Sequence, residues 1–238
     1  MIDINSDMGE INRLLADGTY ERLMNHVTSI NVACGGHAGN ETIMAAVVEI
    51  AKNKSVKVGA HPGYPDKENF GRIDIHIDQD ELMDSIRDQI QLLVDIARGN
   101  GVELTHVKPH GALYNRAASD EAVAQTITEA VIQVDPLLKV IGLAGSKMLS
   151  VFNALGLDTM AEGFADRTYE SDGMLRNRKF GDALITDPKK AANQATAMIN
   201  GYVVAVDGSE VPIDAQTICI HGDTPNAEAI AKAVRAVL

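Results

Sequence analysis

Short hydrophobic runs alternate with longer amphipathic stretches along the whole chain. Short runs rich in Val, Ile and Ala are typical of strands buried in a sheet. Stretches in which apolar residues recur every three to four positions are typical of helices that bury one face. Because a helix follows almost every strand, the pattern predicts a parallel sheet covered by helices. The predicted strands cover residues 2–6, 29–34, 56–60, 104–107, 139–143, 158–162 and 217–220.

Capping residues predict where several of the helices begin. Asp78 lies three residues before Glu81, a spacing typical of a capping box. Pro188 occupies a favoured first helical position. A hairpin is expected within residues 202–215, around Asp207-Gly208. The other predicted helix starts are Asn40, Ser119 and Thr224-Pro225.

Reactive side chains follow the predicted strands, and four of the seven histidines lie beside or near a glycine there. In a barrel the carboxyl ends of all strands open on one mouth, whereas in an open sheet they meet only where the strand order reverses. The pattern therefore predicts a TIM-like (β/α) barrel of about seven strands, with residues 1–238 forming one domain. The side chains expected to converge on its mouth are Asp7, His37, His61, His110 and His221.

The composition narrows the possible partners and compartments. The formal net charge of −12 opposes binding to nucleic acid and to anionic membrane surfaces. Two cysteines are too few for a disulfide framework and favour a reduced, cytoplasmic compartment. We expect no signal peptide, since residues 1–5 have no basic region or long apolar run, and no membrane-spanning segment.

Six motifs resemble, in order along the chain, those of the LamB/YcsF family. They are IDINSDMGE at 2–10, NVACGGHAG at 31–39, GAHPGYPD at 59–66, VKPHGALYN at 107–115, EGFADR at 162–167 and CIHGDTP at 219–225. The resemblance implies a distorted (β/α) barrel of the deacetylase-like superfamily. It also implies ATP-dependent ring opening of 5-oxoproline (pyroglutamate) to L-glutamate, with this chain acting as an A subunit beside B and C subunits.

The chain departs from the family pattern at a few positions. Ser6 stands where members often have Cys or Ala, and Ile11 stands where a glycine usually follows the first motif. Gly36 replaces a frequent Phe, and Asn40 replaces a frequent Asp. We expect the loss of the Phe and Asp side chains to reshape the wall of the pocket.

Opening a lactam needs an activated water, a polarised carbonyl and a proton for the leaving nitrogen. The candidates for this catalysis are Asp7, His61, Lys108, His110 and His221. Lys108 and Arg167 could also hold a carboxylate or a phosphoryl oxygen. The residues expected to bind the substrate are Asn5, Glu10, His37, Arg72, Asp166, Arg167 and Arg178. The histidines without the glycine context, expected to be structural or on the surface, are His26, His76 and His106.

Lys108 and His110 flank Pro109, which restricts Lys108 to an extended backbone. Both side chains should then enter the mouth together, because residues two apart in a strand share a face. We expect this mouth to be solvated, so that replacing either residue changes the stability little. Repulsion by the Lys108 ammonium is expected to lower the pKa of His110 and keep it a neutral general base.

The sequence leaves the presence of a divalent metal open. Asp7, His61 and His110 could form an Asp-His-His site with free coordination positions. Their spacing is not the close i, i+4 spacing that makes such a prediction strong, and Lys108 could supply positive charge in place of a metal.

Two other motifs compete for chemical roles. Residues 142–147 lack the spacing of a phosphate-binding loop, so ATP is expected to bind with partner subunits. Cys34 lies three residues from His37 and could be a nucleophile, but a buried thiol is the favoured interpretation.

Two functions other than an ATP-dependent 5-oxoprolinase fit the same mouth. A metal-dependent amidase or carbohydrate deacetylase would not use ATP. A non-catalytic regulator would bind a sugar or an acid without turnover.

Overall fold

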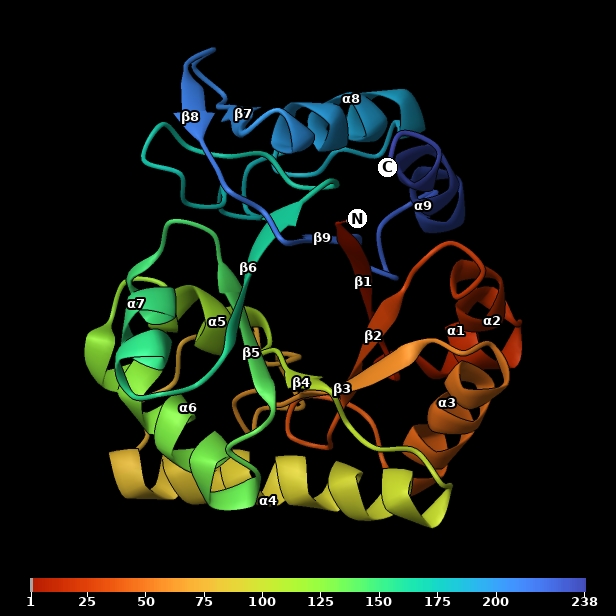
Figure 1. Ribbon diagram of the computed structural model, residues 1–238, viewed down its shortest axis with the longest axis vertical. Coiled ribbons are helices and arrows are strands. Elements are labelled where there is room, and N and C mark those ends of the chain that lie inside the picture. The colour runs from red at the N-terminus through yellow and green to blue at the C-terminus, as the bar shows by residue number, and fades with distance from the viewer. Residues whose placement is uncertain (1) are drawn as a thin grey trace.

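Seven parallel strands pair side by side and close into a barrel, which confirms the predicted fold (Figure 1). The computed structural model describes residues 2–238. β9 pairs with both β6 and β1 and thereby closes the barrel. Around the barrel, the strands are β1 (Asp3–Met8), β2 (Ser29–Ala33), β3 (Lys57–His61), β4 (His106–Val107), β5 (Lys139–Leu143), β6 (Thr159–Phe164) and β9 (Thr217–Cys219).

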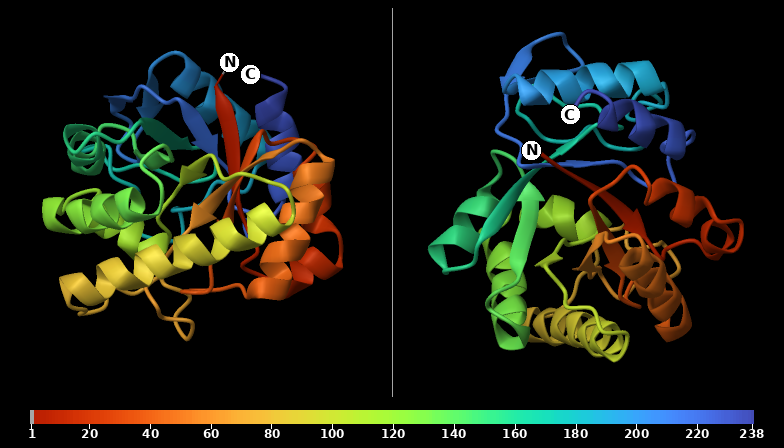
Figure 2. Two further views of the ribbon diagram at one scale, coloured as in Figure 1. Left: turned by 60° about the horizontal axis from the view of Figure 1, so that its bottom comes forward. Right: turned by 45° about the vertical axis from the view of Figure 1, so that its right-hand side comes forward.

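Helices cover the outside of the strands (Figures 1 and 2). They are α1 (Asn12–Ala16), α2 (Thr19–Leu23), α3 (Glu41–Asn53), α4 (Gln79–Gly99), α5 (Gly111–Ala117), α6 (Glu121–Val134), α7 (Lys147–Ala154), α8 (Pro188–Ile199) and α9 (Ala227–Arg235). The long helix α4 contacts α3 and α6 and buries Leu82, Ile86 and Ile90, as their spacing predicts. Within residues 2–238, no helix combines the length and the apolar character needed to cross a membrane.

A short hairpin outside the barrel confirms the predicted turn at Asp207-Gly208. β7 (Tyr202–Val204) and β8 (Glu210–Pro212) pair in antiparallel fashion near the top of Figure 1. The Asp207 carboxylate accepts a hydrogen bond from the Ser209 N–H at 3.0 Å, and Gly208 has a φ of 88°. Such a left-handed conformation is readily adopted by glycine.

Two of the predicted helix starts are confirmed by their caps. The Asn40 side chain accepts a hydrogen bond from the Ile43 N–H, and α3 begins at the next residue. Pro188 is the first residue of α8, and the Asp187 carboxylate caps the helix by accepting from the Lys190 N–H.

Three details of the predicted helix starts are wrong. The helix α4 does begin after Asp78, as predicted, but the Asp78 carboxylate accepts from the Asp80 N–H, and within residues 2–238 the exposed Glu81 carboxylate accepts no capping-box bond from Asp78. Asp120, not Ser119, caps α6, because the Ser119 hydroxyl instead donates to the Arg116 carbonyl in the preceding turn.

The last helix begins at Ala227, later than the predicted Thr224-Pro225. The Thr224 hydroxyl donates a 2.6 Å hydrogen bond to the buried Asp166 carboxylate. This hydroxyl is therefore engaged away from the helix, and Asn226, in a left-handed conformation, is the residue that precedes α9.

Alternating residues of β1 place polar side chains inside the barrel. Asp3 accepts hydrogen bonds from Ser29 and Thr217, which lie on the two neighbouring strands. Asn5 accepts a 2.8 Å hydrogen bond from the Asn31 amide. Because residues two apart share a face, Asp3, Asn5 and Asp7 form a polar column that leads toward the mouth.

His106 is a buried structural residue, as expected from its lack of a glycine neighbour in sequence. Its ring bonds Asn31 Oδ1 and the Thr105 hydroxyl, each at 2.8 Å. Burial lowers the pKa of His106 to about 4. The ring lies directly across Gly59 on the neighbouring strand, where a methyl group would overlap it.

We expect Gly59→Ala to lower the free energy of unfolding by ~1–3 kcal/mol, because the added methyl group overpacks the barrel against His106. Urea unfolding measures the change. Gly99→Ala is the matched control, since no neighbouring atom lies within 4 Å of a methyl group there. Equal stability of the Gly59→Ala variant and the parent would contradict this account of the barrel interior.

Candidate active site

A cavity of about 260 Å³ opens where the strands end at the mouth of the barrel. Strand-end residues line its floor, and loop residues line its sides. The floor residues are Asp7, His61, Lys108, His110, Phe164 and His221, together with Glu10. Four arginines line the sides: Arg72, Arg167, Arg176 and Arg178.

The Lys108 ammonium lies between two buried carboxylates. Its Nζ atom is 3.0 Å from Asp7 Oδ1 and 2.9 Å from Glu162 Oε1. Burial opposes the charged form, but Asp7, Cys219 and Glu162 raise the pKa of Lys108 well above its usual value. Burial would also raise the pKa of Asp7, yet His61 and Lys108 hold it well below its usual value. Lys108 and Asp7 are therefore ionised. With Glu162, they link β1, the end of β4 and β6 beneath the cavity.

Lys108 and His110 both line the cavity, as the sequence predicted, but they are not solvated. Only 2% of Lys108 and 5% of His110 are exposed. The pKa of His110 is lowered chiefly by burial, and His61 supplies the like-charge repulsion that had been assigned to Lys108. The Lys108 ammonium is instead paired with Asp7 and Glu162.

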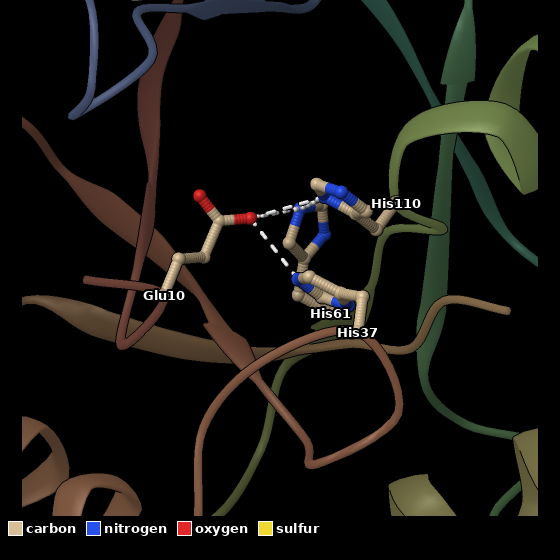
Figure 3. Close-up of side chains that lie close together, drawn as sticks. All are labelled: Glu10, His37, His61 and His110. Carbon is tan, nitrogen blue, oxygen red and sulfur yellow. Dashed lines mark hydrogen bonds and ion pairs between the residues drawn. The ribbon is translucent and has the colours of Figure 1, made fainter. Parts of the chain in front are cut away.

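Glu10 reaches toward three histidine rings that come from the ends of β2, β3 and β4 (Figure 3). Its Oε1 atom is 3.1 Å from His37 Nε2, 3.0 Å from His110 Nδ1 and 3.7 Å from His61 Nε2. The His37 and His110 rings stack in parallel, with centroids 3.6 Å apart.

These residues are the candidate metal ligands of the site. The ligand atoms of Glu10, His37, His61 and His110 lie within 4.8 Å of one another. The sequence had grouped the last two histidines with Asp7. Asp7 Oδ2 lies 3.4 Å from His61 Nε2, but its other oxygen is held by Lys108 and by Asn31. Asp7 also belongs to a second candidate group with Cys219 and His221.

His221 is oriented by a buried carboxylate. Its ring Nδ1 lies 3.0 Å from Asp166 Oδ1, and its backbone N–H donates to Asp166 Oδ2 at 2.9 Å. Burial would raise the pKa of Asp166, but His221 and Thr224 lower it, so the carboxylate is ionised. If Nδ1 carries the hydrogen and donates it to Asp166, the other ring nitrogen, Nε2, is free to accept a proton. His221 lines the cavity, and its Nε2 atom lies 3.9 Å from Asp7 Oδ2.

Arg167 and Arg178 give one side of the cavity a positive charge. Arg167 is buried and donates to the backbone carbonyls of Ala183 and Arg176, and no carboxylate in residues 2–238 forms an ion pair with it. Burial and the neighbouring Arg178 lower the pKa of Arg167 to about 10, so it remains protonated at neutral pH. Arg178 lies 3.9 Å from Asp223, which pairs more closely with Arg72 at 2.6 Å.

Most of the residues predicted for the site line this cavity. Asn5, His37 and Asp166 do not; they contact Glu162, Glu10 and His221, respectively, from behind. The lining residues among those predicted are Asp7, Glu10, His61, Arg72, Lys108, His110, Arg167, Arg178 and His221.

Sequence reasoning missed Glu162 and Tyr114. Tyr114 donates a 2.8 Å hydrogen bond to Glu162 Oε2, opposite the oxygen that faces Lys108. The available signal was a glutamate that follows the apolar residues Met160 and Ala161 in a predicted strand, where an unpaired carboxylate is costly to bury.

The departures expected to reshape the pocket wall are at Gly36 and Asn40. Asn40 is exposed at the start of α3, away from the cavity, and Gly36 does not line it. The space beside Gly36 is filled by the Gln89 side chain, which bonds both the N–H and the carbonyl of Gly63.

The alternative interpretation of Cys34 as a nucleophile is not supported. Burial raises the pKa of its thiol to about 12, and the sulfur accepts a hydrogen bond from the His61 N–H. Residues 142–147 form the end of β5 and the start of α7, as expected for a strand-to-helix turn rather than a phosphate-binding loop.

Comparisons with known proteins agree with the family resemblance and with the fold. The model of the LamB/YcsF family matches residues 2–238. A protein from Chloroflexus aurantiacus that is named as the A subunit of 5-oxoprolinase is 48% identical over 235 residues, covering 98% of this chain and 93% of that protein. One of the same name from Shouchella clausii is 47% identical, covering 100% and 94%. The crystal structure of the lactam utilization protein from Thermus thermophilus superposes with a TM-score of 0.91 at 39% identity, covering 100% of this chain and 95% of that one.

We expect Lys108→Met to lower the free energy of unfolding by ~3–5 kcal/mol, because it leaves two buried carboxylates without a counter-charge. This replaces the expectation of a small effect, which assumed a solvated mouth. Urea unfolding again provides the measurement.

Two further variants test the cause of that loss. Lys139→Met removes a lysine whose ion pair with Asp158 is exposed, and it should cost less than ~1 kcal/mol. Adding Glu162→Gln to Lys108→Met should restore part of the stability, since it removes one of the orphaned charges. If the double variant is no more stable than the single one, repulsion between the carboxylates is not the cause.

Proposed function

The chain belongs to the LamB/YcsF family, and on that premise we propose that it is the A subunit of a 5-oxoprolinase, which hydrolyses 5-oxoproline to L-glutamate. One observation carries the proposal: a histidine oriented by a carboxylate and a buried arginine without a carboxylate partner line the same small cavity. The substrate is a five-membered lactam with one carboxylate. It therefore needs both an anion-binding group and a group that transfers protons.

Arg167 and Arg178 are the proposed carboxylate anchor. Arg167 keeps a planar guanidinium whose two backbone hydrogen bonds fix its position, and Arg178 is close enough to depress its pKa. A bound carboxylate would relieve the repulsion between the two guanidinium groups and form charge-assisted hydrogen bonds with them. This arrangement directs the lactam ring toward the floor of the cavity.

His221 is the proposed base and acid for the ring opening. Its Nε2 atom takes a proton from the attacking water and returns one to the ring nitrogen as the C–N bond breaks. Asp166 holds the tautomer that leaves Nε2 free and stabilises the imidazolium that forms. His61, His110, Lys108 and Asp7 complete the polar floor on which the lactam carbonyl would rest.

ATP enters the proposed reaction through partner subunits, here assigned as B and C subunits. Transfer of the γ-phosphoryl group of ATP to the lactam oxygen releases ADP and makes the lactam carbon a better electrophile. Attack by water and loss of the ring nitrogen then give an acyl phosphate, and a second water yields glutamate and inorganic phosphate. The strand-to-helix turn at residues 142–147 has no phosphate-binding loop, which supports a nucleotide site outside this chain. Two buried free thiols and the use of ATP support a cytoplasmic location.

Reconstitution tests the proposal. We expect the isolated chain to hydrolyse ATP negligibly in the presence of 5-oxoproline, whereas the chain with B and C subunits releases glutamate and inorganic phosphate together. Release of both products is followed over time. Turnover of a simple amide or an acetylated sugar by the chain alone, with metal and without ATP, would instead identify an amidase or a deacetylase.

In the complete complex, we expect His221→Asn to lower kcat by ~10²–10⁴-fold, the usual effect of removing a positioned acid or base. His76→Asn is the control, because His76 lies on the surface. Steady-state kinetics with 5-oxoproline give the comparison, and full activity of the His221→Asn variant would remove His221 from the mechanism.

Arg178→Ala should raise the KM for 5-oxoproline by ~10–100-fold and change kcat less, because it removes a charge-assisted contact to the carboxylate. Arg98→Ala, which removes an exposed arginine on α4, is the matched control. A drop in kcat with an unchanged KM would show that Arg178 does not anchor the substrate.

A further inference from the structure

Backbone carbonyls fix which nitrogen of two cavity histidines carries a hydrogen. His61 Nδ1 lies 2.7 Å from the Lys108 carbonyl oxygen, and His110 Nε2 lies 2.9 Å from the Phe70 carbonyl oxygen. A carbonyl oxygen only accepts hydrogen bonds, so each of these nitrogens must be the N–H donor. In the neutral form that binds a metal ion, the lone pairs of the two rings are on His61 Nε2 and His110 Nδ1.

These two lone pairs and a carboxylate oxygen face one another. His61 Nε2 and His110 Nδ1 are 3.0 Å apart, and Glu10 Oε1 lies 3.7 Å from the first and 3.0 Å from the second. Three acceptors at such separations repel unless a positive particle lies between them. A single proton can form a hydrogen bond between only two of these three atoms at a time, so the repulsion in the other two pairs remains.

A metal ion can satisfy all three acceptors at once. The circumradius of a triangle with sides of 3.0, 3.0 and 3.7 Å is about 1.9 Å. An ion slightly out of that plane would therefore lie ~2.0–2.2 Å from each atom, the range of zinc bonds to imidazole nitrogen and carboxylate oxygen. Histidines that ligate metals also usually donate their other N–H to a carbonyl or carboxylate, as His61 and His110 do here.

His37 supports this site without being a ligand. Its ring is parallel to that of His110, with an interplanar angle of 1° and centroids 3.6 Å apart. A ring nitrogen binds a metal ion through a lone pair that lies in the plane of its ring. An ion in the plane of the His110 ring therefore lies outside the plane of the His37 ring and cannot be bound by it. His37 Nε2 instead contacts Glu10 Oε1 at 3.1 Å, whereas its buried Nδ1 has no partner in the described chain. Its role is to position the Glu10 carboxylate.

We propose that Glu10, His61 and His110 bind one divalent transition-metal ion, such as Zn²⁺, with His37 positioning Glu10. Three protein ligands leave at least one coordination position for water or a substrate oxygen, which is typical of catalytic rather than structural zinc sites. This set differs from the Asp-His-His set expected from the sequence, because the ligand atoms of His61 and His110 gather with Glu10, whereas Asp7 groups with Cys219 and His221. The inference does not rest on the proposed substrate, since binding of the ion is measured without turnover.

Titration of the full-length chain with Zn²⁺, after its metal has been removed with a chelator, tests the site. Competition with a chromophoric chelator should give one ion per chain. The visible spectrum of bound Co²⁺ should indicate nitrogen and oxygen ligands. Glu10→Gln keeps the size of the side chain and an acceptor for His37, so it can weaken binding without loss of the fold.

The variants separate ligands from the positioning residue. Glu10→Gln and His110→Ala should each weaken Zn²⁺ binding by more than ~100-fold, whereas His37→Ala should weaken it by ~10–100-fold, the usual effect of losing an outer-shell partner. His76→Ala, at an exposed histidine, should bind as the parent does. Circular dichroism checks that each variant is folded.

Two results would overturn the inference. The first is a folded parent chain that binds no stoichiometric ion, which would mean that a shared proton satisfies the three acceptors. The second is a folded Glu10→Gln variant that binds Zn²⁺ as tightly as the parent does. Either result would leave the ring-opening proposal intact, because that proposal is tested by glutamate release.

Discussion

The burial of one ammonium group between two carboxylates governs the inside of this barrel. Removing Lys108, Asp7 and Glu162 from water costs several kcal/mol per ion, which their mutual attraction offsets only while all three stay in place. Asp7 and Glu162 lie in β1 and β6, and Lys108 directly follows β4, so the ion cluster holds these three strands together near the mouth. It also engages Asp7 Oδ1 and thereby leaves Oδ2 facing His61.

The same cavity has an acidic and imidazole-rich floor and an arginine-rich side. The chain as a whole has a net charge of −12, whereas Arg167 and Arg178 give one side of the cavity a local positive charge. A small anion is thus drawn to one side of the cavity, and its uncharged part faces the floor. Such a separation of charge orients a ligand before any reaction begins.

The sequence predicts the strands and the residues at their ends well, because alternation and strand-end glycines are local signals. β5 coincides with its prediction, and the five side chains expected at the mouth do come together. The burial of Lys108 could not be predicted, because Glu162 and Tyr114 approach it only after the barrel closes. For the same reason, the pairing of Asp7 with Lys108 could not be predicted. The cap of α6 was missed for a local reason, because the Ser119 hydroxyl bonds the preceding turn and leaves the cap to Asp120.

Lys108 is bound to the site at both ends of the residue: its carbonyl accepts from His61, and its ammonium lies between the carboxylates. The backbone N–H of Lys108 donates to the Ala60 carbonyl, and that of His110 donates to the Pro62 carbonyl. These bonds extend the pairing of β4 with β3. An insertion or deletion here would displace the ammonium and the acceptor of His61 at once. A change of length in the β7–β8 hairpin, which lies outside the barrel, would leave these contacts in place.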